Sequence, residues 1–207
     1  MGKNKFIRYG VLVLIAGFLL YHSIYFKKLS AVRAATPAAF DATTFSKKLF
    51  NEQLPGRIQS AVPLDSLLQA LQTNPAQAFE KYTNALAIGN IRYGLIQASG
   101  RVTAINDDEV TIQVGKVPVH LATEYIYGNA IRDASGLVDV KDFVNTTDLN
   151  NISESLNKQV REEVLPPFKK AVQKSDSVWF AGALELNMEH VHVQSPEVIP
   201  VQIKIID

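Results

Sequence analysis

The stretch "YGLIQASGRVTAINDDEVTIQVG", residues 93–115, decides the fold because its apolar and polar residues alternate. On each side of the "NDDE" turn, every second residue is apolar or small: Ile96, Ala98, Gly100, Val102 and Ala104 before it, and Val110, Ile112 and Val114 after it. A period of two predicts a β-hairpin with one buried face. Gly100, in the middle of the first strand, predicts a sharp bend there.

The segments downstream of the hairpin complete a recognisable element order. A third strand is predicted at 117–121, and apolar residues recur every three or four positions over 149–164, which predicts a helix that ends at Pro166. Apolar residues again occupy every second position at 178–186 and 198–205, which predicts two more strands. Three strands, a helix and two strands predict an α+β fold built on an OB-like five-stranded β-barrel, with a large helical insertion at about 128–172 between strands three and four.

The segment upstream of the hairpin has helical periodicity. Leucines at 64, 67, 68 and 71 form one stripe of an amphipathic helix, and Pro55-Gly56 is predicted to end an earlier helix. We therefore predict three regions: a membrane anchor at 1–28, a helical segment at 29–92 that packs on the barrel, and the barrel with its insertion at 93–207.

The N-terminus resembles a membrane-directed leader. Residues 1–40 hold six basic and no acidic residues, whereas the remaining residues hold 15 basic and 20 acidic ones. Between Gly10 and Phe26 no residue carries a formal charge. A retained transmembrane anchor at 9–26 is favoured over a cleaved signal peptide, because bulky residues separate the apolar run from the small residues at 31–35. This predicts a single-pass protein of the cytoplasmic membrane, with its N-terminus inside and its folded domain in the periplasm.

The composition excludes several kinds of chemistry. With no cysteine there is no disulfide, thiolate metal site or cysteine nucleophile. The net charge of −5 on the body of the chain argues against nucleic-acid binding. G-x-S-x-G, H-E-x-x-H, P-loop and dinucleotide fingerprints do not occur. We predict a protein that is not an enzyme, without catalytic residues, cofactor or resident metal.

One segment is rich enough in polar residues to suggest a site: "GNAIRDASGLVDVKDFVN", residues 128–145. Arg132 could present its guanidinium to a carboxylate or phosphate ligand. Alternatively, Arg132 pairs with Asp133, Asp139 or Asp142 and fixes the loop, which is the interpretation we favour. For Asp139 and Asp142, capping of a short helix near Lys141 is favoured over metal binding.

His190 and His192 lie two residues apart near a strand end and could both point toward one metal ion. They alternate with valines, as residues on a solvent face do, and no neighbouring cysteine or third histidine completes a ligand set. The solvent-face interpretation is therefore favoured.

The chain resembles a bacterial family of unknown function whose members are predicted periplasmic lipoproteins, often encoded beside sugar ABC-transporter genes. The resemblance rests on "GRVTAI", the 128–145 segment, "LNKQVREEVLPPF", "VWFAGALEL" and "VIPVQIKI", in that order. It implies an extracytoplasmic location, a link to carbohydrate import, and a site at the motif positions Arg132, Asp133, Asn145 and Asn157. Lipoprotein members carry a leader cysteine, which this variant lacks.

Three functions follow as hypotheses. The leading one is a membrane-anchored accessory or binding module for a small polar ligand such as a sugar, or for an ABC transporter or its substrate-binding protein. A structural scaffold in an envelope complex is the second. The third is a carbohydrate-active hydrolase that takes two carboxylates from Glu124, Asp133, Asp139 and Asp142.

Overall fold

The computed structural model describes residues 3–23, 40–191 and 193–206. The chain forms two compact units, residues 1–40 and residues 41–207. In the first unit the described structure is the helix α1 (Lys3–Ser23). The sheet and the other helices among the described residues belong to the second unit.

The expected membrane anchor at 9–26 is wrong. Among the residues that the structure describes, no helix is both long enough and apolar enough to cross a bilayer. Basic residues occupy the start of α1, at Lys3, Lys5 and Arg8. Residues 24–26 of the expected anchor lie outside the described residues.

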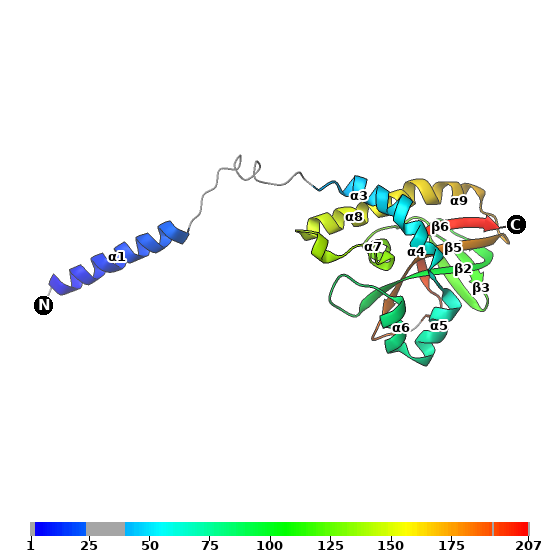
Figure 1. The fold of residues 1–207 in the computed structure, drawn as a ribbon, viewed down its shortest axis with the longest axis horizontal. Coiled ribbons are helices and arrows are strands. Elements are labelled where there is room, and N and C mark those ends of the chain that lie inside the picture. The colour runs from blue at the N-terminus through cyan, green and yellow to red at the C-terminus, as the bar shows by residue number, and fades with distance from the viewer. Residues whose placement is uncertain (1–2, 24–39, 192, 207) are drawn as a thin grey trace. The chain divides into compact units, whose positions relative to one another are not determined.

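The second unit is organised around a six-stranded sheet (Figure 1). Its strands are β1 (Val62–Pro63), β2 (Ile91–Ile105), β3 (Glu109–Val114), β4 (Val117–Ala122), β5 (Ser177–Asn187) and β6 (Glu197–Ile206). The order is β1-β2-β3-β4-β6-β5, and β2 also pairs with β5. The predicted hairpin is confirmed, because β2 and β3 pair antiparallel with Val102 opposite Ile112.

The expectation of a closed five-stranded barrel is also wrong. The sheet has a sixth strand, since β1 adds to β2 in parallel at Ile96 and Gln97. β2 divides its length between two partners, pairing with β5 over 91–101 and with β3 over 101–105. β4 and β6 meet in parallel over two residue pairs, from His120 and Leu121. Closure requires long, staggered pairing at every joint, so these short joints leave a partly open OB-like sheet.

Two groups of helices cover the sheet, one before β2 and one between β4 and β5. The first group is α3 (Ala42–Lys48), the π-helical turn 49–53, α4 (Leu54–Gln59), α5 (Leu64–Thr73) and α6 (Pro75–Tyr82). The second is α7 (Ala130–Ser135), the 3₁₀ turn 140–142, α8 (Thr146–Gln159), the π-helical turn 160–164 and α9 (Leu165–Ala171). In Figure 1, α3, α8 and α9 lie on one side of the strands and α5 and α6 on another.

Prolines shape two of these helices differently from the prediction. Pro55 and Pro166 were expected to end helices, yet each lies within a continuous helical run. Proline lacks an N–H and its ring collides with the carbonyl four residues earlier. In both runs a π-helical turn immediately precedes the proline-containing helix. The wider turn accommodates the proline, so the helix continues.

Two apolar clusters hold these layers together. One joins the helices α3, α4, α7 and α8 to the sheet face that carries Tyr93, Leu95 and Ala183. The other joins α5 and α6 to the opposite face, where Ile96, Ile112 and Phe180 are fully buried. The alternation of Leu95 and Ile96 between the two clusters is the strand periodicity of two. β2 therefore contributes to both cores.

Glycine is required where strands approach each other most closely. A Cβ on Gly100 would collide with the carbonyl oxygen of Gln113, and a Cβ on Gly182 would lie 2.5 Å from the carbonyl oxygen of Ile199. Both glycines lie beside register shifts, between Val102 and Ala104 in β2 and between Ala181 and Gly182 in β5. The bend predicted at Gly100 is thus a site of backbone contact.

Replacement of Gly100 by alanine should destabilise the domain by about 1–3 kcal/mol, because the added methyl group overpacks the joint between β2 and β3. The free energy of unfolding in urea measures this. Gly56→Ala is the matched control, since a Cβ on Gly56 in α4 meets nothing within 4 Å and alanine should stabilise that helix by roughly 0.5–1 kcal/mol. Equal stability of the two variants would contradict the proposed contact.

Candidate functional site

The polar segment 128–145 contains the short helix α7, which is completely buried. Gly128 and Gly136 flank α7, and both have positive φ angles (78° and 61°) that favour glycine. Every residue of α7 is buried, including Arg132 and Asp133. A buried helix with two charged residues needs internal partners for those charges.

Arg132 finds its partners within the protein. Its Nε lies 2.7 Å from Oδ1 of Asp133, and its NH1 donates to the carbonyl oxygen of Leu149 at 3.1 Å. The other carboxylate oxygen of Asp133 accepts from the side-chain amide of Asn129 at 2.7 Å. The expected pairing of Arg132 with a neighbouring aspartate is therefore present, with Asp133 as that aspartate.

The remaining motif residues lie in two different places. Asn157 is buried on α8, and its amide donates to the carbonyl oxygen of Gly128 at 2.8 Å. Its Oδ1 is buried without a hydrogen-bond partner among the described residues. Asn145 is exposed and caps α8 by accepting from the N–H of Asp148 at 2.9 Å. The fold brings Arg132, Asp133 and Asn157 together around α7 and leaves Asn145 at the end of α8.

The carboxylates considered for hydrolysis are dispersed. Asp133 is paired with Arg132, and exposed Glu124 lies 3.1 Å from Nζ of Lys169. Asp139 accepts from the N–H of Lys141 and caps the 3₁₀ turn 140–142, which confirms the capping prediction. Asp142 lies within that turn.

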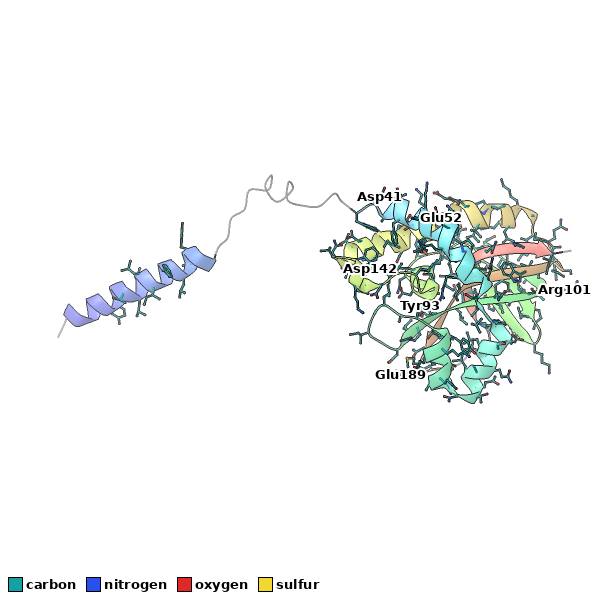
Figure 2. All side chains as sticks on the ribbon, in the orientation of Figure 1. Asp41, Glu52, Tyr93, Arg101, Asp142 and Glu189 are labelled. Carbon is teal, nitrogen blue, oxygen red and sulfur yellow. The ribbon has the colours of Figure 1, made fainter. Side chains whose placement is uncertain are left out.

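The buried network continues to the sheet through Tyr93, which lies on β2 well away from Arg101 (Figure 2). The Tyr93 hydroxyl lies 3.3 Å from Oδ1 of Asn129. Burial raises the pKa of Tyr93 to about 12, with further contributions from the charge of Glu185, a hydrogen bond to it and the charge of Asp133, while the bond to Asn129 acts in the opposite direction. Glu185 is also the cross-strand neighbour of Tyr93.

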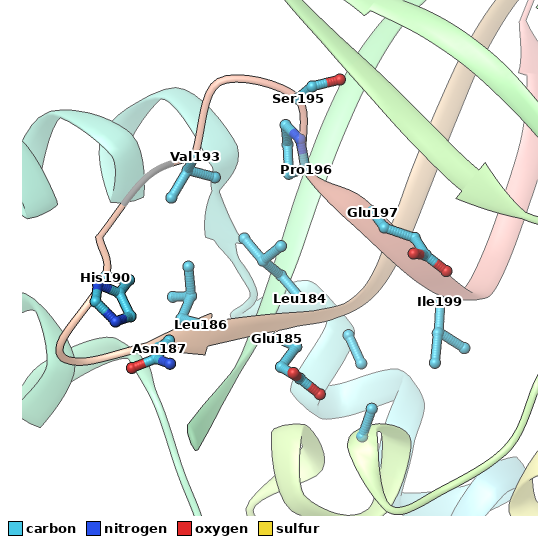
Figure 3. Close-up of a pocket in the computed structure, with 12 residues that line it drawn as sticks. Leu184, Glu185, Leu186, Asn187, His190, Val193, Ser195, Pro196, Glu197 and Ile199 are labelled. Carbon is cyan, nitrogen blue, oxygen red and sulfur yellow. The ribbon is translucent and has the colours of Figure 1, made fainter. Parts of the chain in front are cut away.

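Glu185 forms part of the wall of a surface pocket of about 360 Å³ (Figure 3). The pocket lies where β5 ends, β6 begins and α7 starts, with Ala130 of α7 in its wall. Its lining combines aliphatic side chains with carboxylate, amide, imidazole and hydroxyl groups, namely Leu184, Leu186, Val193, Ile199, Glu185, Glu197, Asn187, His190 and Ser195. Apolar walls with a few converging polar groups are typical of small-molecule sites.

The sequence did not identify this pocket. Glu185 alternates with buried Leu184 and Leu186, so its position indicated a solvent-facing residue of a strand. Glu197 begins β6, and the register ends at Leu184 opposite Val198, which makes Glu185 and Glu197 the next residues on the two strands. That register is a tertiary property. Of the two histidines considered for metal binding, His190 lines the pocket and His192 lies outside the described residues.

Two other hollows also carry polar side chains, but neither has a residue of α7 in its lining. One of about 570 Å³ lies beside Trp179 and the turn at Gly115, and one of about 400 Å³ lies between α5 and α6. Across the described parts of the chain, no three histidine, aspartate or glutamate side chains are grouped as a metal site requires. The pocket beside α7 is the candidate site because it borders the motif network.

The comparisons with known proteins bear on this arrangement. The model of a family described as "Predicted periplasmic lipoprotein (DUF2291)" matches residues 14–204. The chain belongs to this family. The match includes β1–β6 and α3–α9, and with them the buried network and the pocket. No curated protein matches the chain significantly.

A solved structure supports the fold. The chain is similar to an OB-fold protein from Thermotoga maritima MSB8, with 28% sequence identity and a TM-score of 0.72. The similarity covers 82% of this chain and 100% of that protein. The predicted α+β class and OB likeness are therefore confirmed, whereas the anchor and the closed barrel are not.

Replacement of Arg132 by alanine should destabilise the domain by about 3–5 kcal/mol, because it leaves the buried charge of Asp133 without its counter-ion. Urea unfolding measures the loss. Lys158→Ala provides the control: Lys158 of α8 and Glu162 of the π-helical turn 160–164 form an exposed pair at 3.9 Å, and its loss should cost about 0.5 kcal/mol or less. Equal effects of the two substitutions would contradict a buried ion pair.

Tyr93 should make the stability depend on pH under alkaline conditions. Between pH 10 and about 12 its hydroxyl ionises in the unfolded chain but stays neutral in the folded one, since burial and Glu185 raise its pKa. The unfolded state then binds fewer protons, so the free energy of unfolding falls as the pH rises through this interval. Tyr93→Phe should lack this component. A difference between the two proteins that does not change with pH would exclude it.

Proposed function

We propose that this chain is an extracytoplasmic binding module that takes a small, neutral, polyhydroxylated ligand such as a sugar in the pocket between β5, β6 and α7. The observation that carries the proposal is the convergence of Glu185, Glu197 and Asn187 on one pocket with aliphatic walls. Carboxylates and amides accept hydrogen bonds from hydroxyl groups, and the aliphatic residues suit the C–H faces of a sugar ring. Two carboxylates make an anionic ligand unfavourable there.

The motif residues act in this proposal by positioning the pocket wall. Arg132 and Asp133 fix α7, which places Ala130 in the wall, and Asn129 and Tyr93 connect that network to Glu185. Asn157 holds the entry to α7 at Gly128. Asn145 sets the start of α8, whose Leu149 carbonyl oxygen accepts from Arg132. Each motif residue therefore helps to position the pocket wall without lining the pocket itself.

The periplasmic description of the family supports the extracytoplasmic location. The resemblance described from the sequence adds a link to carbohydrate import, in which the module would present or receive the imported sugar. A partner within such a transporter is part of the proposal, and it would bind close to the pocket opening.

The proposal is tested by measuring the binding of a panel of monosaccharides to the full chain, with calorimetry or ligand-observed NMR. Glu185→Gln and Glu197→Gln should each weaken binding of the best sugar by roughly 10-fold or more, because each removes a charge-assisted hydrogen bond. Glu163→Gln is the matched control, since Glu163 is exposed on the π-helical turn 160–164 and is not in the pocket lining.

The result that would contradict the proposal is equally direct. Binding that is unchanged in Glu185→Gln and Glu197→Gln would place the ligand elsewhere. Failure of every neutral sugar to bind, with binding of an amine or an anion instead, would reject the proposed ligand class.

A further inference from the structure

Three polar side chains form a connected row beside the pocket. Oε1 of Glu109 lies 2.8 Å from Nδ1 of His120, and Nε2 of the same imidazole lies 2.6 Å from Oγ of Ser195. Glu109 and His120 are each about 30% exposed (31% and 29%), and Ser195 is exposed. The order of carboxylate, imidazole and hydroxyl, with both distances in the hydrogen-bond range, is that of a catalytic triad.

The sheet register explains how these residues meet. Thr111 on β3 is opposite His120 on β4, so Glu109, two residues before Thr111, is on the same face and diagonal to the imidazole. His120 is also paired with Glu197 of β6, and Ser195 precedes Glu197 by two residues. The backbone N–H of His120 donates to the carbonyl oxygen of Pro196 and fixes the loop. The row therefore runs from β3 across β4 to the loop that precedes β6.

The hydrogen-bonding capacities of the groups set the tautomer of His120. An ionised carboxylate can only accept hydrogen bonds, so Nδ1 of a neutral imidazole donates to Glu109. Nε2 then carries the lone pair and accepts the proton of the Ser195 hydroxyl. This is the arrangement in which a histidine acts as a general base on a serine. Asn106 adds a longer contact of 3.4 Å to the same oxygen of Glu109.

We propose that Ser195 is a nucleophile, activated by His120 and oriented by Glu109, for the hydrolysis of a carboxylic ester of a small polyhydroxylated alcohol, such as an O-acetylated sugar. Ser195 itself lines the 360 Å³ pocket, together with Glu185 and Glu197. Figure 3 shows Ser195 on the loop that leads into β6. The choice of substrate rests on the proposed function, whereas the activation of Ser195 rests on the row alone.

The reaction balances without any further reagent. Oγ of Ser195 adds to the carbonyl carbon as its proton passes to Nε2 of His120. The ester C–O bond then breaks, and the departing alcohol takes that proton, which leaves the acyl group on Ser195. Water adds to the acyl carbon and gives its proton to Nε2, and Oγ leaves and regains a proton. Ester and water become carboxylic acid and alcohol.

A structural role would be a polar clamp that fixes the loop before β6. Such a clamp needs the same hydrogen bonds but does not need a reactive hydroxyl. A fluorophosphonate probe separates the two roles, because it forms a covalent bond with an activated serine and carries no sugar.

The experiment treats the full chain with a fluorescent fluorophosphonate and locates the adduct by mass spectrometry. We expect the adduct on Ser195, with labelling reduced roughly 100-fold or more in Ser195→Ala and His120→Asn, and reduced by a smaller factor in Glu109→Gln. Ser66→Ala is the matched control: Ser66 is exposed and contacts the carboxylate of Asp65 at 3.4 Å, and its replacement should leave labelling unchanged.

A wild-type chain without an adduct on Ser195, or an adduct that forms equally in His120→Asn, would overturn the nucleophile. Hydrolysis of O-acetylated monosaccharides tests the substrate separately. Glu185→Gln should raise KM for such an ester. If the wild-type chain binds no sugar but still forms the fluorophosphonate adduct on Ser195, the proposed ligand is rejected and the nucleophile is retained. The two failures are therefore distinguishable.

Discussion

β2 contributes to both apolar clusters of the domain, and this depends on a residue without a side chain at position 100, which is Gly100. There the strand passes so close to Gln113 that a Cβ would collide with its carbonyl oxygen. The close approach lets one strand of 15 residues pair with β5 along its first part and with β3 along its last. Because both apolar clusters include residues of β2, they hold a fixed relation to each other. The buried network reaches the sheet through Tyr93 of the same strand.

The second constraint is electrostatic. α7 is buried with an arginine and an aspartate inside it, and burial of charges is tolerated only where partners replace water. Arg132 pairs with Asp133, and the side-chain amide of Asn129 donates a hydrogen bond to the same carboxylate. Tyr93 contacts Asn129 and so links the network to Glu185 at the pocket. A polar chain of this kind specifies one position for α7. It therefore connects the polar segment 128–145 with the candidate site, although Arg132 is itself buried.

The two proposals share a surface and differ in the chemistry that they need. Binding needs the pocket and its carboxylates, whereas ester hydrolysis also needs the row of Glu109, His120 and Ser195 at the pocket edge. That row contains no sequence motif, because its members come from β3, β4 and the loop before β6 and are neighbours only through the sheet register. The G-x-S-x-G and S-x-x-K patterns describe the residues immediately around a nucleophilic serine, and the residues around Ser195 match neither pattern.

The sequence by itself determined the hairpin at 93–115, the α+β class and the cap at Asp139, because each depends on contacts between residues near in the chain. It misjudged Pro55 and Pro166, where a π-helical turn accommodates the proline, and it predicted an anchor and a closed barrel that the structure contradicts. Only the tertiary structure decided that Arg132 lies inside the protein, and that Glu185, Glu197 and Ser195 line one pocket. The alternation of apolar and polar residues along a strand predicts which side chains face outward. The strand register, which is set by long-range pairing, decides which other residues those side chains contact.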